Sequence, residues 1–255
     1  MSRFFAISKN SLTVIFMGRY DLSWNGHQTD LVERQHVSAS RVRSFAYRSV
    51  CLVGRLVEKN VMPLGTAFSL GGNRFATAAH VVGLSDINLV LCLESINSSE
   101  TYQLDGERPV STARAKIEHF DPVTDIAILN SPNLSYMSRP EVEGTDKLKI
   151  GDLVSSFGFP HADFSRVVIT YQENPIGAKV LLESHNLLIK HLVLNTMARP
   201  GQSGAPVFDS NGRIRAMLVG GYSPNPSGIS LGGVDPLTLH QTTHAVSSEY
   251  LQEFV

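Results

Sequence analysis

The stretch Arg199-Pro-Gly-Gln-Ser-Gly-Ala-Pro206 decides the interpretation of this chain, because it places a serine between glycines just after a β-like run. Glycine has no Cβ, so the backbone can turn sharply and approach a substrate carbonyl closely. The backbone N–H groups of Gly201 and Ser203 can then converge on a developing oxyanion. The pattern indicates a nucleophile for acyl transfer at Ser203, although the same pattern also occurs in ordinary turns.

Two blocks upstream supply the other groups that such a serine needs. The apolar run of residues 75–82 contains His80, and an acidic turn at residues 121–125 enters a second apolar run. The chain order is therefore His, Asp, Ser, which is one of three orders that this triad takes on unrelated folds. A histidine can also be a buried core residue, and Asp121 is a rival to Asp125. We prefer Asp125, because an aspartate before proline favours local capping.

Taken together, these blocks resemble the trypsin-like serine endopeptidases, and within them the HtrA-type branch. Residues 77–80 (Thr-Ala-Ala-His) resemble the histidine motif of that family, and residues 124–129 resemble its aspartate motif. Residues 200–206 resemble the serine motif, and residues 151–160 resemble the strand that opens the second barrel. The resemblance runs from about residue 46 to residue 255.

The resemblance implies an all-β fold with two six-stranded antiparallel β-barrels of chymotrypsin type and a short C-terminal helix. Short β-rich runs separated by turn clusters agree with barrels. We expect a first barrel over residues 46–145 and a second over residues 146–255. Residues 1–45 form an extension without helical periodicity, which could be an added strand, a lid or a partner surface. We expect no PDZ domain of the kind common in HtrA-type proteins, because the two barrels leave no room for one in these residues.

The family mechanism carries over to the matching positions. Ser203 would attack the carbonyl carbon, and His80 would take its proton and later give it to the leaving amine. Asp125 would hold the imidazole in the correct tautomer, and the amides of Gly201 and Ser203 would bind the oxyanion. This mechanism needs no cofactor.

Substrate contacts are implied at two further places. Residues 196–199 would line the specificity pocket, and no acidic residue lies there, so a basic side chain before the scissile bond is disfavoured. We expect a small or medium apolar side chain instead, and an edge strand that pairs with extended substrate. The residues implied in these contacts are Met197, Ala198, Val219, Gly220 and Gly221.

The chain departs from the family pattern at two positions beside the serine. Trypsin-like zymogens have an aspartate where Gln202 stands, and that aspartate pairs with a newly cut N-terminus. Since Gln202 carries no charge, we expect no activation by N-terminal cleavage. Ala205 replaces a glycine that is usual after the serine, which adds only one methyl group.

Composition excludes several other classes of protein. The chain has 255 residues, of which 42% are hydrophobic and 18% charged, and a formal net charge of −1. No overall field steers it to nucleic acid, and no apolar run is long enough for a membrane span. The resemblance to serine endopeptidases, and not the composition, implies a protein or peptide substrate. The spacing of His240 and His244 could suit a metal on a helix, but the intervening Gln-Thr-Thr is β-like, so we expect no metal site.

The cellular location is inferred from cysteines and from the N-terminus. Cys51 and Cys92 are predicted to be small buried residues, because two cysteines make no disulfide framework. Residues 11–17 form a short apolar run without a clear cleavage site, which favours a strand over a signal peptide. These features favour a cytoplasmic location over a secreted or periplasmic one.

Two other functions stay open at this point. A catalytically latent scaffold of the same fold could bind a partner, although it would have no physical need for all three triad residues. An esterase could use the same triad, and its activity on simple esters but not on peptides would separate it from a protease.

Overall fold

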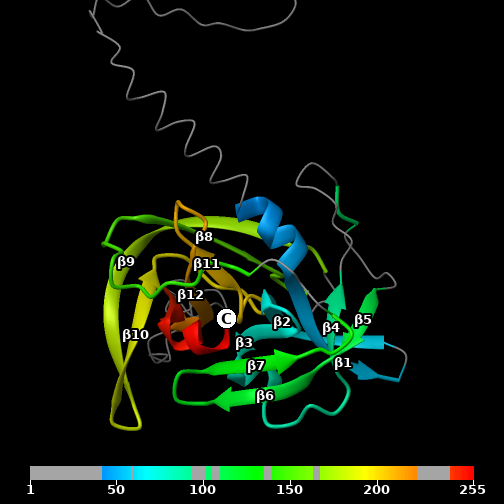
Figure 1. The fold of residues 1–255 in the computed structure, drawn as a ribbon. Helices are drawn as coiled ribbons and strands as arrows, with labels where there is room; N and C mark the ends of the chain where they lie inside the picture. Colours follow the sequence, from blue (N-terminus) through cyan, green and yellow to red (C-terminus); the bar gives the residue numbers. More distant parts are fainter. Residues whose placement is uncertain are drawn as a thin grey trace, which may run out of the picture.

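The computed structural model describes residues 42–58, 60–93, 102–104, 110–134, 139–162, 167–222 and 242–255. Within these ranges the chain is mostly β-strand, in two antiparallel units that lie side by side (Figure 1). The all-β prediction is therefore confirmed. The predicted strand at residues 11–17 lies outside the described residues.

The N-terminal unit is a seven-stranded sheet with the order β5-β4-β1-β2-β3-β7-β6. Its strands are β1 (Val50–Val57), β2 (Asn60–Gly71), β3 (Arg74–Ala78), β4 (Leu89–Leu93), β5 (Ser111–Arg114), β6 (Lys116–Asp121) and β7 (Ile126–Asn130). A single helical turn, α2 (Ala79–Val82), follows β3 directly. The sheet therefore differs in strand number from the six expected, and the described strands form no closed ring.

The C-terminal unit is a closed six-stranded barrel in the order β10-β13-β12-β11-β8-β9. Its strands are β8 (Leu153–Gly158), β9 (Thr170–Ser184), β10 (Leu187–Leu194), β11 (Pro206–Phe208), β12 (Ile214–Tyr222) and β13 (Thr242–Ser247). The chain then ends in η3 (Ser248–Phe254), so the predicted C-terminal helix is present as a 3₁₀ helix.

A helix over residues 42–49 packs against the C-terminal barrel and then continues into β1 of the N-terminal sheet. Phe45 meets Phe208 edge to face at 5.8 Å between ring centroids, and Tyr47 meets Phe157 in the same manner at 5.9 Å. Such aromatic pairs add stability beyond their buried area. The expectation that residues 1–45 contain no helix is wrong at their end, because this helix crosses the predicted boundary at residue 45.

The hydrophobic core joins the two units. One cluster of buried side chains contains Phe68 and Phe75 of the sheet together with Phe157 and Phe208 of the barrel. A second cluster fills the barrel itself. Both cysteines are buried, as predicted. The shared core explains why loops from both units meet at one place, where the candidate site lies.

Candidate active site

His80 is held by Asp125 through two separate contacts. Nδ1 of the His80 ring lies 2.6 Å from Oδ2 of Asp125, and the backbone N–H of His80 donates to Oδ1 at 2.8 Å. The Asp125 carbonyl also accepts from the N–H of Ala79 at 3.0 Å. The ring therefore has a fixed orientation, and its other nitrogen, Nε2, has no hydrogen-bond partner within the described residues.

The turn before β7 places the Asp125 carboxylate. Asp125 has φ +58°, which few residues other than glycine adopt, although aspartate and asparagine tolerate it better than most. Such conformations cluster at functional sites. The rival Asp121 instead accepts from the N–H of Val123 at 2.8 Å and from the hydroxyl of Thr124 at 2.7 Å. The structure thus brings Asp125 to His80, while Asp121 caps its own turn.

Arg55 holds the other end of the segment that carries His80. Its guanidinium donates to the carbonyl of Val82 at 2.6 Å, to that of Ile87 at 2.6 Å, and to that of Ser85. Helix α2 is only one turn long, so its carbonyls need partners outside the helix. The sequence analysis missed Arg55, because nothing in the local sequence links β1 to this loop.

Ser203 lies on the loop before β11, next to α2. A Cβ built on Gly65 would lie 2.8 Å from the side chain of Val81 and 3.0 Å from the carbonyl oxygen of Ser203. The helix of His80 and the serine loop are therefore close neighbours across Gly65. No hydrogen bond joins the Ser203 hydroxyl to His80 within the described residues; in unliganded enzymes this contact is often long.

The Gln202 side chain is buried and holds the serine loop without a charge. Its Oε1 accepts from the N–H of Arg199 at 2.8 Å, and its Nε2 donates to Oε1 of Gln172 at 3.2 Å. Gln172 in turn donates to the hydroxyl of Thr196. An amide can satisfy both a donor and an acceptor in this position, so no pairing with an amino terminus is needed.

The residues expected to contact substrate are not all in one cavity. A cavity of about 220 Å³ lies on the Gln202 side of the loop, and Met197 and Arg199 line it, whereas Ala198 does not. On the side away from β13, the pairing of β12 with β11 ends at Met217, and Leu218 still exchanges backbone hydrogen bonds with Gly204 and Ala205. Among the described residues, Val219, Gly220 and Gly221 have no strand partner on their other side, which leaves an open edge there.

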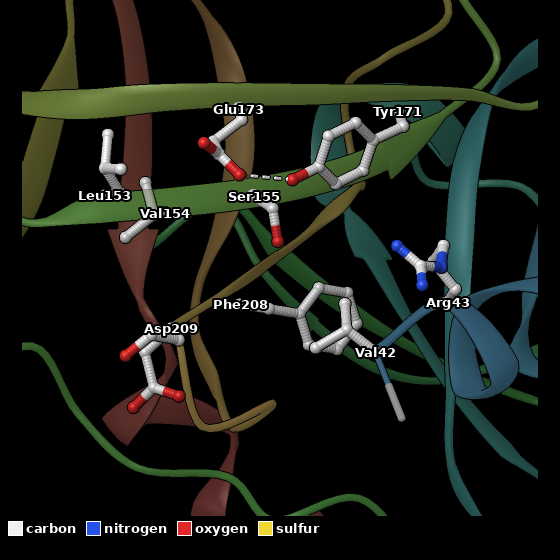
Figure 2. A pocket seen from close by; sticks show the side chains of 10 residues that line it. Val42, Arg43, Leu153, Val154, Ser155, Tyr171, Glu173, Phe208 and Asp209 are labelled. Carbon is white, nitrogen blue, oxygen red and sulfur yellow. Dashed lines mark hydrogen bonds between the residues drawn. The ribbon is translucent and has the colours of Figure 1, made fainter. Parts of the chain in front are cut away.

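A second cavity, of about 260 Å³, lies between the helix at 42–49 and the barrel, and Tyr171 lines both cavities. Figure 2 shows the residues that line this cavity. The hydroxyl of Tyr171 donates to the Glu173 carboxylate at one edge of the cavity, and Arg43 and Asp209 lie on two other sides of it. Burial and the Glu173 carboxylate raise the pKa of Tyr171 to about 12. None of the predicted triad residues lines this cavity.

The described residues contain no group of three side chains that could hold a metal ion, and His240 lies outside them. Among the helices of the described ranges, none has the length and apolar character that crossing a bilayer requires.

Comparisons with known proteins agree with this geometry. Residues 65–217 match the model of the trypsin-like peptidase domain. A curated relative from Pseudomonas putida (strain W619), named "Probable periplasmic serine endoprotease DegP-like", is 25% identical over 164 residues. That alignment covers 62% of this chain and 29% of the relative, so the chain spans less than a third of the relative's length.

Solved structures of the same fold include proteases from several sources. Rv3671c from M. tuberculosis, in an inactive form, has a TM-score of 0.58 at 19% identity, covering 86% of this chain and 90% of its own. The HtrA-type protease AlgW with a tripeptide has a TM-score of 0.59 at 20% identity, and the match covers 85% of this chain and 62% of AlgW. The MamO protease domain from Magnetospirillum magneticum has a TM-score of 0.60 at 14% identity, and the match covers 83% of this chain and 97% of the MamO domain. At these identities the likeness establishes the chymotrypsin-type fold.

One expectation is contradicted by these relatives. The cytoplasmic location inferred from the cysteines and the N-terminus is wrong, since the curated relative carries the name of a periplasmic enzyme. Cysteine number is a poor guide here, because a two-unit fold with a large shared core needs no disulfide for stability. The family resemblance, in contrast, is confirmed, because the domain model matches more than half of the residues. The chain belongs to the trypsin-like peptidase family.

Proposed function

We propose that this chain is a serine endopeptidase that hydrolyses peptide bonds through an acyl-enzyme, with Ser203, His80 and Asp125 as its triad. The observation that carries the proposal is the double contact of Asp125 with His80, at 2.6 and 2.8 Å. That contact leaves Nε2 of His80 available to a nucleophile on the neighbouring loop. The family match supports the reaction class.

The proposed reaction uses these groups in turn. The hydroxyl oxygen of Ser203 bonds to the carbonyl carbon of the substrate while His80 takes the hydroxyl proton. The amides of Gly201 and Ser203 stabilise the resulting oxyanion. His80 then protonates the leaving amine, and water cleaves the acyl-enzyme by the same route in reverse. Asp125 keeps the ring oriented and stabilises its charged form.

A peptide is the proposed substrate, and the open edge of β12 is its proposed docking strand. Backbone groups of Val219, Gly220 and Gly221 would pair with the extended peptide, while Met197 and Ala198 would contact its side chain before the scissile bond. A solved structure of AlgW holds a tripeptide, which supports a peptide ligand for this fold. We also propose a periplasmic or secreted location, following the name of the curated relative.

Intact mass after incubation with a fluorophosphonate tests the proposal. We expect one adduct on the wild-type protein and none on the variants Ser203→Ala and His80→Ala. Ser210→Ala removes an exposed serine outside the site and serves as the control, with an adduct expected. An unlabelled but folded wild-type protein would favour the latent scaffold, and hydrolysis of simple esters without any hydrolysis of peptides would favour an esterase.

A further inference from the structure

The Thr66 side chain, on β2 of the N-terminal sheet, lies between three segments of the candidate site and is fully buried. Its hydroxyl donates to the carbonyl of Gly201 at 2.7 Å and accepts from the N–H of Phe159 at 3.2 Å. Its backbone N–H donates to the carbonyl of Ser203 at 2.9 Å. One residue of the sheet is thus bonded to both loops of the barrel that surround the serine.

The loop that Thr66 contacts is a tight turn with a defined orientation. The N–H of Gln202 donates to the carbonyl of Arg199 at 3.0 Å, and Gly201 has φ +93°. With proline at its second position and a positive φ at its third, this is a type II turn. A type I turn of the same residues would reverse the peptide between Pro200 and Gly201.

The orientation of that peptide decides whether an oxyanion hole exists. The Pro200 carbonyl accepts from the N–H of His161 at 2.8 Å. In a trans peptide the N–H points opposite to the carbonyl, so the Gly201 N–H points away from His161. Neither the Gly201 N–H nor the Ser203 N–H has an acceptor within the described residues. Both donors are therefore available to one external oxygen.

Thr66 supports this orientation from both sides. It holds the Gly201 carbonyl directly, and through Phe159 it holds the segment whose His161 N–H holds the Pro200 carbonyl. The two segments are in close contact, since a Cβ on Gly201 would lie 2.2 Å from the carbonyl oxygen of Phe159. Without the hydroxyl, the carbonyl of Gly201 and the N–H of Phe159 would both lose a buried partner.

We infer that Thr66 is a positioning residue for the oxyanion hole, whose hydroxyl keeps the Pro200–Gly201 peptide in the orientation that presents the Gly201 N–H to the substrate. The inference rests on the proposed function. It also means that the first structural unit controls a catalytic element of the second through one hydroxyl group.

The test compares Thr66→Val, which keeps the shape and removes the hydroxyl, with Thr66→Ser, which keeps the hydroxyl. Ser69→Ala is the matched control, because Ser69 is a fully buried residue of the same strand whose hydroxyl, among the described residues, bonds only to the N–H of Gly71. For each variant, kcat and KM are measured on a fluorogenic peptide substrate. The inhibition constant of a peptide aldehyde is measured as well, since its adduct with a serine carries the oxyanion.

We expect Thr66→Val to lower kcat by roughly tenfold to a hundredfold with little change in KM, because the hole acts on the transition state. The aldehyde should bind more weakly by a similar factor. Thr66→Ser should stay within about threefold of wild type, and Ser69→Ala should leave both the inhibition constant and kcat unchanged.

Several outcomes would overturn the inference. One is a wild-type kcat in Thr66→Val, and another is an equal loss in Thr66→Val and Ser69→Ala, which would mean a general loss of packing. A higher KM with an unchanged kcat would point to a role in substrate binding instead. If Thr66→Val fails to fold, Thr66→Ala, which leaves more room, replaces it in the same comparison. A wild-type protein without hydrolysis or fluorophosphonate labelling would refute the proposed function itself, and this inference with it.

Discussion

The histidine half and the serine half of the candidate site are held in different ways. His80 and Asp125 both belong to the N-terminal unit, and the contacts that join them lie within that unit. The serine loop belongs to the barrel, yet the carbonyls of Ser203 and Gly201 are bonded to Thr66 of the sheet. The histidine half is therefore a property of one unit, whereas the serine half needs the two units packed together.

This difference suggests how the site can fail. A change within the sheet can remove the base while the barrel keeps its shape. A change at the junction can loosen the nucleophile loop, because the hydrogen bonds there depend on close approach of two separate backbones. The following variants separate these two kinds of failure, from the largest expected effect to the smallest.

Removal of either reacting group should abolish the chemistry without unfolding the protein. We expect Ser203→Ala and His80→Ala each to lower kcat by about 10⁶, because the triad acts as a unit. Both side chains are partly exposed, so the melting temperature should change little. Peptide hydrolysis and calorimetry provide the measurements. Full activity in the Ser203→Ala variant would refute the mechanism.

Asp125→Asn should lower kcat by about 10⁴ near neutral pH, because an amide can hold the wrong tautomer of the ring. The matched control is Asp121→Asn, which affects a carboxylate that accepts hydrogen bonds from Val123 and Thr124 of its own turn. We expect this control to keep activity close to that of wild type. Equal losses in the two variants would assign the effect to the turn rather than to the contact with His80.

Gly204→Ala probes the junction. A Cβ on Gly204 would lie 2.0 Å from the carbonyl oxygen of Thr66, and the residue has φ +87°. We expect a loss of at least about 3 kcal/mol in the free energy of unfolding, since the backbones must separate. Gly72→Ala is the control, because Gly72 also has a positive φ, +58°, and a Cβ added there would have no atom of the described residues within 4 Å. Its loss should be about 1 kcal/mol. Denaturant unfolding measures both, and a similar loss in both would show that backbone strain alone is responsible.

The smallest effect concerns His191, which is buried on β10 with its ring 6.2 Å from that of His244. Burial lowers the pKa of His191, while the Ile189 carbonyl and the Asp125 carboxylate act in the opposite direction. The folded protein therefore binds this proton less readily than the unfolded chain does. The protein therefore loses stability as the pH falls below the histidine pKa of the unfolded chain, which is about 6.5.

His191→Gln should reduce that acid sensitivity. From pH 7 to pH 5, the melting temperature of this variant should fall less than that of the wild type. The difference between the two falls should be on the order of 2 °C. The control is His185→Gln, in the exposed turn between β9 and β10, which should follow the wild-type curve. Parallel curves for all three proteins would mean that another group carries the acid sensitivity.

Much of the fold and the triad candidates could be predicted from the sequence, because the signals are local. The strand runs, the Pro200–Gly201 turn and the choice of Asp125 over Asp121 depend on residues within a few positions of one another. The location could not be predicted in this way. A low cysteine count reflects the size of the core as much as the redox compartment, and the comparison with a periplasmic relative overturned the prediction.

The sequence by itself therefore determined the family, the order of His80, Asp125 and Ser203, and the glycines that the serine loop requires, because each is written in a short motif. Only the tertiary structure decided what holds that loop. Thr66 and Gly201 are 135 positions apart, and their hydrogen bond exists only because two units share one core. The same is true of Arg55 and the loop after His80, 27 to 32 positions away. Hydrogen bonds between a side chain and a backbone far away in the sequence leave no periodicity or motif in a single sequence, because they depend on how the folded chain packs.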